Sequence, residues 1–201
     1  MIEPPLKTPP ELLASLAVAG IQVQDVWDLV NSKAAYPAGI PILLDWLEHF
    51  DERITKDPRD LFREGLVRAL TVAEARPIAA PVLLREFKKA KSSPSLCWAI
   101  GNALSVVATQ DYLDDLLDLV QDKDYGTGRR EIVSSLGRYR DARVVPVLTN
   151  LLQDNDVSAH ALEALRRLKP PDIRRWVEPL LHDPRPLVRR EARKTLAKLP
   201  D

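Results

Sequence analysis

Two columns of apolar residues recur along the chain at intervals of about thirty residues, and this spacing limits the possible folds more than any other feature. The first column is Leu47, Phe87, Val120, Leu152 and Leu181, with steps of 40, 33, 32 and 29 residues. The second column is Leu70, Leu104, Leu136, Leu165 and Leu196, with steps of 34, 32, 29 and 31 residues. Two columns with the same spacing of about thirty residues indicate an array of repeats, each made of one supersecondary unit.

The segments that carry these columns have the pattern of helices. Apolar residues three and four positions apart are frequent, whereas the alternation typical of strands is rare. The chain has 7 glycines and 17 prolines, and most prolines fall between apolar segments. Pro41, Pro81 and Pro146 stand where first helices of repeats would begin, and Asp57 precedes Pro58 as a candidate N-cap. The sequence therefore predicts an all-α protein.

The last repeat carries a recognisable family pattern. Its sequence LLHDPRPLVRREARKTLAKL, residues 180–199, fits L-L-x-D-x-x-x-x-V-R-x-x-A-x-x-x-L-x-x-L. This pattern resembles the HEAT repeat, in the short variety seen in lyase-like HEAT proteins of bacteria. The resemblance covers residues 40–201 and implies a right-handed α-solenoid, a superhelix of antiparallel helix pairs.

The resemblance also implies roles for polar residues in each repeat. Asp122, Asp154 and Asp183 lie in the turns between paired helices, where each could cap the second helix by accepting backbone N–H groups. An arginine position near the start of the second helix is filled by Arg63, Arg129 and Arg189 in three repeats. Arg189 is expected to belong to the scaffold and to pair with turn aspartates.

The chain divides by pattern into a cap and an array. Residues 1–38 contain two short helical segments, TPPELLASLAVAG and QDVWDLVNS, the first ended by Gly20. We expect this part to be an N-terminal helical cap that covers the open face of the first repeat. Residues 39–201 are predicted to form about five HEAT-like repeats in one continuous domain.

Composition excludes several classes of protein. Basic and acidic residues number 29 each, so the overall charge favours neither nucleic acid nor a membrane surface. The charge is uneven, because residues 1–125 have a net charge of −6 and residues 126–201 a net charge of +6. No signal peptide or membrane-spanning run is evident. We expect a cytoplasmic, monomeric protein.

No set of residues predicts catalysis, a metal site or a cofactor. His49, His160 and His182 fall in different repeats and lack partners at metal-ligand spacing. Cys97 is the single cysteine and has no histidine near it in sequence, so packing is the expected role. The segment YGTGRRE lacks the spacing of a phosphate-binding loop.

A binding surface is predicted on the second helices of the repeats, which line the concave side of HEAT-like stacks. Positions beside the apolar stripe would align there, and Trp98 is a candidate anchor, because tryptophan and arginine dominate binding hot spots. The sequence thus favours a non-enzymatic scaffold for a protein or peptide partner. The predicted groove residues are Trp98, Asn102, Arg130, Ser134, Arg190 and Lys194.

Two alternatives follow from the resemblance. HEAT-like DNA glycosylases have a similar architecture and hold DNA on a basic concave surface, so nucleic-acid binding is the first alternative. The lyase-like HEAT family includes proteins that attach tetrapyrrole chromophores to other proteins, and Cys97 is the candidate nucleophile of this second alternative. The basic segment at residues 180–199 could also be a polar end that keeps the last repeat soluble.

Overall fold

The computed structural model describes residues 7–30, 32–55, 60–76 and 78–199, and within these ranges the chain is helical and has no strand. The all-α prediction is therefore confirmed for the described chain. The predicted cap at Asp57 lies outside the described residues. The chain forms two compact units, Met1–Thr109 and Gln110–Asp201.

The first unit begins with the two short helices expected from the sequence. Gly20 follows the first of them with φ of 82°, a left-handed conformation that glycine adopts without strain. The α-helices of the unit are α1 (Pro10–Val18), α2 (Val26–Val30), α3 (Ile40–Glu48), α4 (Phe50–Arg53), α5 (Asp60–Ala69), α6 (Ala80–Lys89) and α7 (Pro94–Val107). Short 3-10 turns are η1 (Pro37–Gly39), η2 (Ala73–Ala75) and η3 (Ala90–Ser92).

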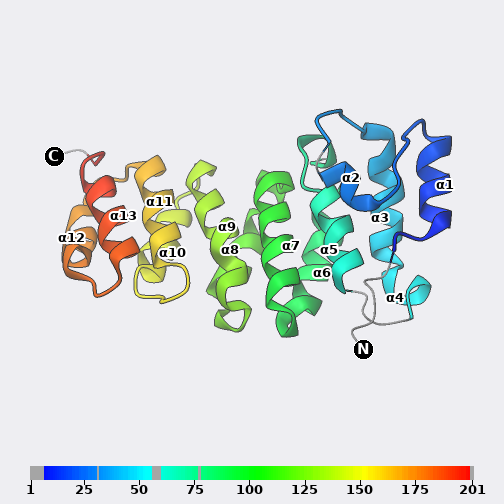
Figure 1. Ribbon diagram of the computed structural model, residues 1–201. Coiled ribbons are helices and arrows are strands. Elements are labelled where there is room, and N and C mark those ends of the chain that lie inside the picture. Colours follow the sequence, from blue (N-terminus) through cyan, green and yellow to red (C-terminus); the bar gives the residue numbers. More distant parts are fainter. Residues whose placement is uncertain (1–6, 31, 56–59, 77, 200–201) are drawn as a thin grey trace. The chain divides into compact units, whose positions relative to one another are not determined.

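Helix α5 is the centre of the packing in this unit, since it contacts α2, α3 and α7 (Figure 1). The approach of α2 is close at Gly65. A Cβ atom there would lie 2.7 Å from Cγ1 of Val26 and 3.1 Å from Nε1 of Trp27. Glycine is thus required where α2 covers α5. This contact agrees with a capping role for residues 1–38, which stays a prediction.

In the second unit, the members of the second apolar column are Leu136 in the 3-10 segment η6, Leu165 in α11 and Leu196 in α13. Its α-helices are α8 (Leu113–Gln121), α9 (Arg130–Ser135), α10 (Val144–Leu151), α11 (Ser158–Leu168), α12 (Arg174–Val177) and α13 (Pro186–Leu196). The 3-10 segments are η4 (Gln110–Tyr112), η5 (Lys123–Arg129), η6 (Leu136–Arg138) and η7 (Glu178–His182).

Helix α11 lies between α9 and α13 and packs on both (Figure 1). The 3-10 segment η6, which follows α9, approaches α11 closely at Gly137. A Cβ atom there would lie 2.9 Å from the backbone of Ala164. On the other side, the Thr195 hydroxyl donates to the Leu162 carbonyl at 3.0 Å, so a buried side chain joins α13 to α11. Helix α11 is therefore packed between α9 and α13 within the second unit.

The two apolar columns form the core of both units. Leu47, Phe87, Val120 and Leu152 of the first column are buried, and so are Leu70, Leu104, Leu136 and Leu165 of the second. Their last members, Leu181 and Leu196, are half-buried. The spacing thus identified core positions correctly. The handedness of the superhelix, the antiparallel pairing and the division at residue 38 stay predictions.

Candidate functional site

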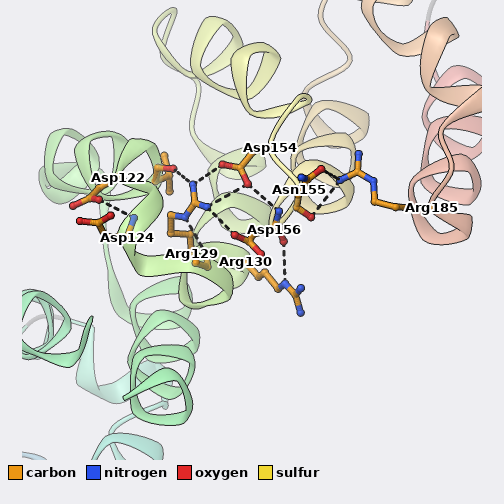
Figure 2. Close-up of polar contacts among 10 residues, drawn as sticks. Asp122, Asp124, Arg129, Arg130, Asp154, Asn155, Asp156 and Arg185 are labelled. Carbon is orange, nitrogen blue, oxygen red and sulfur yellow. Dashed lines mark hydrogen bonds and ion pairs between the residues drawn. The ribbon is translucent and has the colours of Figure 1, made fainter. Parts of the chain in front are cut away.

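The turns of the second unit are joined by a polar network centred on Arg129, as Figure 2 shows. Arg129 is fully buried, and its guanidinium donates to both carboxylate oxygens of Asp154, at 3.0 and 3.2 Å. It also donates to the carbonyls of Val120 and Gly126, at 3.0 and 3.1 Å. A buried arginine bound on all sides in this way links the turn before α9 to the turn before α11 and belongs to the scaffold.

Each turn aspartate accepts a backbone N–H two residues later. Asp122 accepts from Asp124, Asp154 from Asp156 and Asp183 from Arg185, at distances of 3.0, 2.9 and 2.8 Å. For Asp154 and Asp183 this is a correction to the predicted capping of the second helices, because the bonds close the turns themselves. Asp122, in contrast, is the N-cap of η5, the 3-10 segment that leads into α9. Neither α11 nor α13 has a side-chain cap at its N-terminus.

The charge pairing also differs from the expectation for Arg189. Arg189 donates to the carbonyls of Asp183 and Pro184, both at 2.8 Å, and the carboxylate of Asp183 instead binds Arg185 at 2.7 Å. Arg129 also pairs with a turn aspartate, Asp154. Burial raises the pKa of Asp154, but the hydrogen bonds from Arg129 and the Asp156 backbone outweigh it and lower the pKa overall.

Trp98 and Asn102 lie on α7 in the first unit and are both half-buried. The guanidinium of Arg68 stacks over the Trp98 ring, 5.3 Å from its centroid. Arg68 is in turn held by Glu64 at 2.7 Å, and Glu64 also accepts from the Ser95 hydroxyl at 2.7 Å. The ring of Trp98, the predicted anchor, is thus partly covered by Arg68 of α5.

Two of the predicted basic residues, Arg190 and Lys194, lie at a hollow between α11 and α13. The hollow has a volume of about 330 Å³. Arg190 and Lys194 on α13 line it, and their side chains are 63% and 54% exposed. Ala159 and Glu163 of α11 stand one repeat before Arg190 and Lys194, at the two equivalent positions beside the apolar stripe, and line the hollow from the other side. The remaining lining residues are His160, Arg166, Leu187 and Glu191.

Glu191 holds the basic side chains of this hollow together. It accepts from Arg166 at 2.7 Å, from Lys194 at 2.9 Å and from Arg190 at 3.2 Å, and it is buried. Burial raises the pKa of Glu191, but the hydrogen bonds and charges of Arg166 and Lys194 lower it to about 2. No role for Glu191 was predicted from the sequence. One glutamate placed among six basic residues of the last repeat was the available signal.

Arg130 and Ser134 on α9 are tied to neighbouring turns and helices. The Nε atom of Arg130 donates to the Asp156 carbonyl at 3.0 Å, as Figure 2 shows, and Arg130 is half-buried. Ser134 is buried at 8% exposure, and its carbonyl accepts from Arg167 at 3.4 Å. Ser134 therefore offers little surface to a partner, in contrast to Arg190 and Lys194.

His160 lines the same hollow in a neutral state. Burial lowers the pKa of its imidazole, and the nearby charge of Arg130 lowers it further. Its Nδ1 atom is buried and has no hydrogen-bond partner. His160 thus adds no positive charge to the hollow near neutral pH.

The environment of Cys97 does not support the alternative in which this residue is the nucleophile for chromophore attachment. The residue is 2% exposed, and burial raises the pKa of its thiol to about 11. A protonated, inaccessible thiol is a poor nucleophile. The described residues contain no cluster of histidine, cysteine, aspartate or glutamate able to hold a metal ion. Among these residues, no helix combines the length and apolar character needed to cross a bilayer.

Trp176 is an exposed aromatic residue of the second unit. Its side chain is 49% exposed on α12, and the guanidinium of Arg175 lies 5.4 Å from its ring centroid. Trp46, in contrast, is buried in the first unit, where its ring lies at 77° to that of Phe62 with the ring centroids 6.3 Å apart.

Comparison with known proteins supports the repeat assignment. The family model described as HEAT repeats matches residues 80–159, which include α6 to α10 and the start of α11. Searches of the curated proteins and of the solved structures found no significant match. The matched residues include Phe87, Val120 and Leu152 of the first apolar column and Leu104 and Leu136 of the second, all of them buried. Residues 80–159 of the chain therefore carry HEAT repeats.

Proposed function

We propose that the protein is a non-enzymatic scaffold that binds a protein or peptide partner on the exposed face of α11 and α13. HEAT repeats generally act as protein-interaction scaffolds, because stacked helix pairs present a long surface that is supported by a continuous core. The scaffold residues and the surface residues of this chain are separable. Arg129 and most residues of the two apolar columns are buried, whereas Arg190 and Lys194 are exposed.

One observation carries the proposal: residues from both predicted positions of two successive second helices line the same hollow. Ala159 and Arg190 occupy the first position, and Glu163 and Lys194 the second. The packing of α11 on α13 brings them together, as the repeat register requires. Leu187, which is 46% exposed, adds an apolar side chain to a charged surface. Such a mixture is typical of protein-binding surfaces.

Trp98 and Asn102 provide a second candidate contact on the first unit. Trp98 is a rigid aromatic residue that is partly exposed, which suits a binding anchor. The ion pair of Arg68 with Glu64 holds a cation against its ring. A partner could replace or extend this stacking.

Affinity capture tests the proposal directly. The tagged protein would be used to capture partners from the source cells, the captured proteins would be identified by mass spectrometry, and binding would be repeated with purified partner. Arg190→Glu with Lys194→Glu should weaken binding at least about tenfold, as loss of two interface charges does. The control variant is Lys123→Glu with Arg140→Glu, which makes the same charge change at exposed positions of the same unit.

The outcomes separate the possible functions. Equal binding by the wild type and the Arg190/Lys194 variant would reject this face as the binding surface. Tight binding of duplex DNA, with a steep salt dependence that the Arg190/Lys194 variant reduces, would favour the nucleic-acid alternative. The exposed apolar side chain of Leu187 in the hollow supports a protein partner over a phosphate backbone.

A further inference from the structure

The hollow between α11 and α13 has more basic than acidic groups. Arg166, Arg190 and Lys194 all donate to the single carboxylate of Glu191. The other acidic side chain, Glu163, is paired with Arg167 at 2.6 Å. Four cations therefore share two carboxylates, and the excess positive charge can attract an anionic ligand.

The three cations around Glu191 are not equivalent. The Arg166 side chain is 24% exposed and makes the shortest of the three bonds, 2.7 Å, so it is the structural partner of Glu191. Arg190 and Lys194 are more than half exposed and bind the same oxygen, Oε1, at 3.2 and 2.9 Å. Exposed side chains of this kind can turn toward a ligand without leaving Glu191 unpaired, because Arg166 remains bound to Oε2.

Leu187 gives the hollow an apolar side chain at a defined place. Leu187, Arg190 and Lys194 follow the helical spacing of three and four residues, so they share one face of α13. Leu187 and Lys194 are two turns apart, a rise of about 10 Å. An extended peptide covers this distance in about three residues.

We propose that this hollow binds an acidic segment of the partner protein, with an apolar side chain against Leu187 and carboxylates paired with Arg190 and Lys194. This proposal rests on the proposed scaffold function and specifies the chemistry of its ligand. Charge complementarity draws the segment to the surface, and the contact with Leu187 favours a peptide over a nucleic acid.

Fluorescence anisotropy with synthetic peptides tests the ligand chemistry. The probe is a fluorescein-labelled peptide with the core Glu-Glu-Gly-Leu-Gly-Glu-Glu, which places carboxylates on both sides of the leucine and so allows either chain direction. Two matched peptides replace every glutamate by glutamine or the leucine by alanine. We expect the first probe to bind and the glutamine peptide to bind at least about tenfold more weakly. The alanine peptide should bind severalfold more weakly than the probe, because it loses the contact with Leu187.

Variants of the protein locate the binding. Arg190→Glu with Lys194→Glu should weaken probe binding at least about tenfold, and Leu187→Ala severalfold. The Lys123→Glu with Arg140→Glu variant should bind as the wild type does. Far-UV circular dichroism and the unfolding midpoint of each variant establish that the fold is retained.

Three results would overturn the proposal: no binding of the acidic probe, equal binding of the glutamine peptide, or probe binding that Arg190→Glu with Lys194→Glu leaves unchanged. If a captured partner depends on Arg190 and Lys194 but the probe does not compete with it, the ligand chemistry is wrong and the scaffold function stands. If the captured partner is insensitive to both residues, the proposed binding face itself is wrong.

Discussion

Replacement of Arg129 by methionine should destabilise the protein far more than replacement of any exposed arginine. Methionine keeps much of the aliphatic volume but removes the donors to Asp154, Val120 and Gly126. The Asp154 carboxylate, 6% exposed, would remain buried with its one backbone bond from Asp156. Loss of one partner from a buried ion pair costs about 3–5 kcal/mol. We expect this loss in the free energy of unfolding.

Urea unfolding, followed by far-UV circular dichroism with midpoint and slope both fitted, measures the change. The control is Arg143→Met, which removes an exposed arginine paired with Asp114 and Asp141. Exposed ion pairs contribute about 0–1 kcal/mol, so the control should lose no more than that.

A double-mutant cycle isolates the ion pair from the rest of the change. Asp154→Asn keeps an oxygen that can accept from the Asp156 N–H but removes the charge. In the Arg129→Met background this second change should restore about 1–3 kcal/mol, because the carboxylate no longer lacks a cation. A loss below about 1 kcal/mol for Arg129→Met, or the same effect of Asp154→Asn in both backgrounds, would refute the reasoning.

Three further predictions test the core, the acid sensitivity and the cysteine. Leu136→Ala and Leu165→Ala, at fully buried positions of the second column, should each cost about 2–5 kcal/mol in chemical denaturation, and losses below about 0.5 kcal/mol would contradict the repeat register. Glu191 has a pKa lowered from 4.5 to about 2, so its contribution is present above pH 4.5 and is lost as the pH falls through about 2. Acid titration of stability should show that Glu191→Gln removes about 3 kcal/mol of this pH dependence, and an unchanged profile would show that the carboxylate is not held by its cations. The Cys97 thiol, with its pKa raised from 9.0 to about 11, should react with Ellman's reagent about 100-fold more slowly in the folded protein than in denaturant, and rapid labelling of the folded form would reopen the question of a nucleophile.

The sequence alone determined the helical class and the positions of the core. Repeat spacing identified Leu104, Leu136 and Leu165 as buried, because a residue that recurs at the same place in each helix pair must face the same neighbour. The family resemblance also came from the sequence, since the pattern of leucine, aspartate, arginine and alanine is local. The helical class, the core positions and the family pattern all depend on residue spacing within one repeat and on its recurrence in the next repeat.

The pairing of charged side chains was decided by the tertiary structure. The sequence contains several arginines and aspartates at equivalent positions, and it does not show that Arg129 is buried against Asp154 while Arg189 binds backbone carbonyls of its own turn. The same applies to Glu191, which gathers cations from both α11 and α13. Long charged side chains can reach several partners, and the choice among them depends on small differences in burial and distance that arise when helices pack.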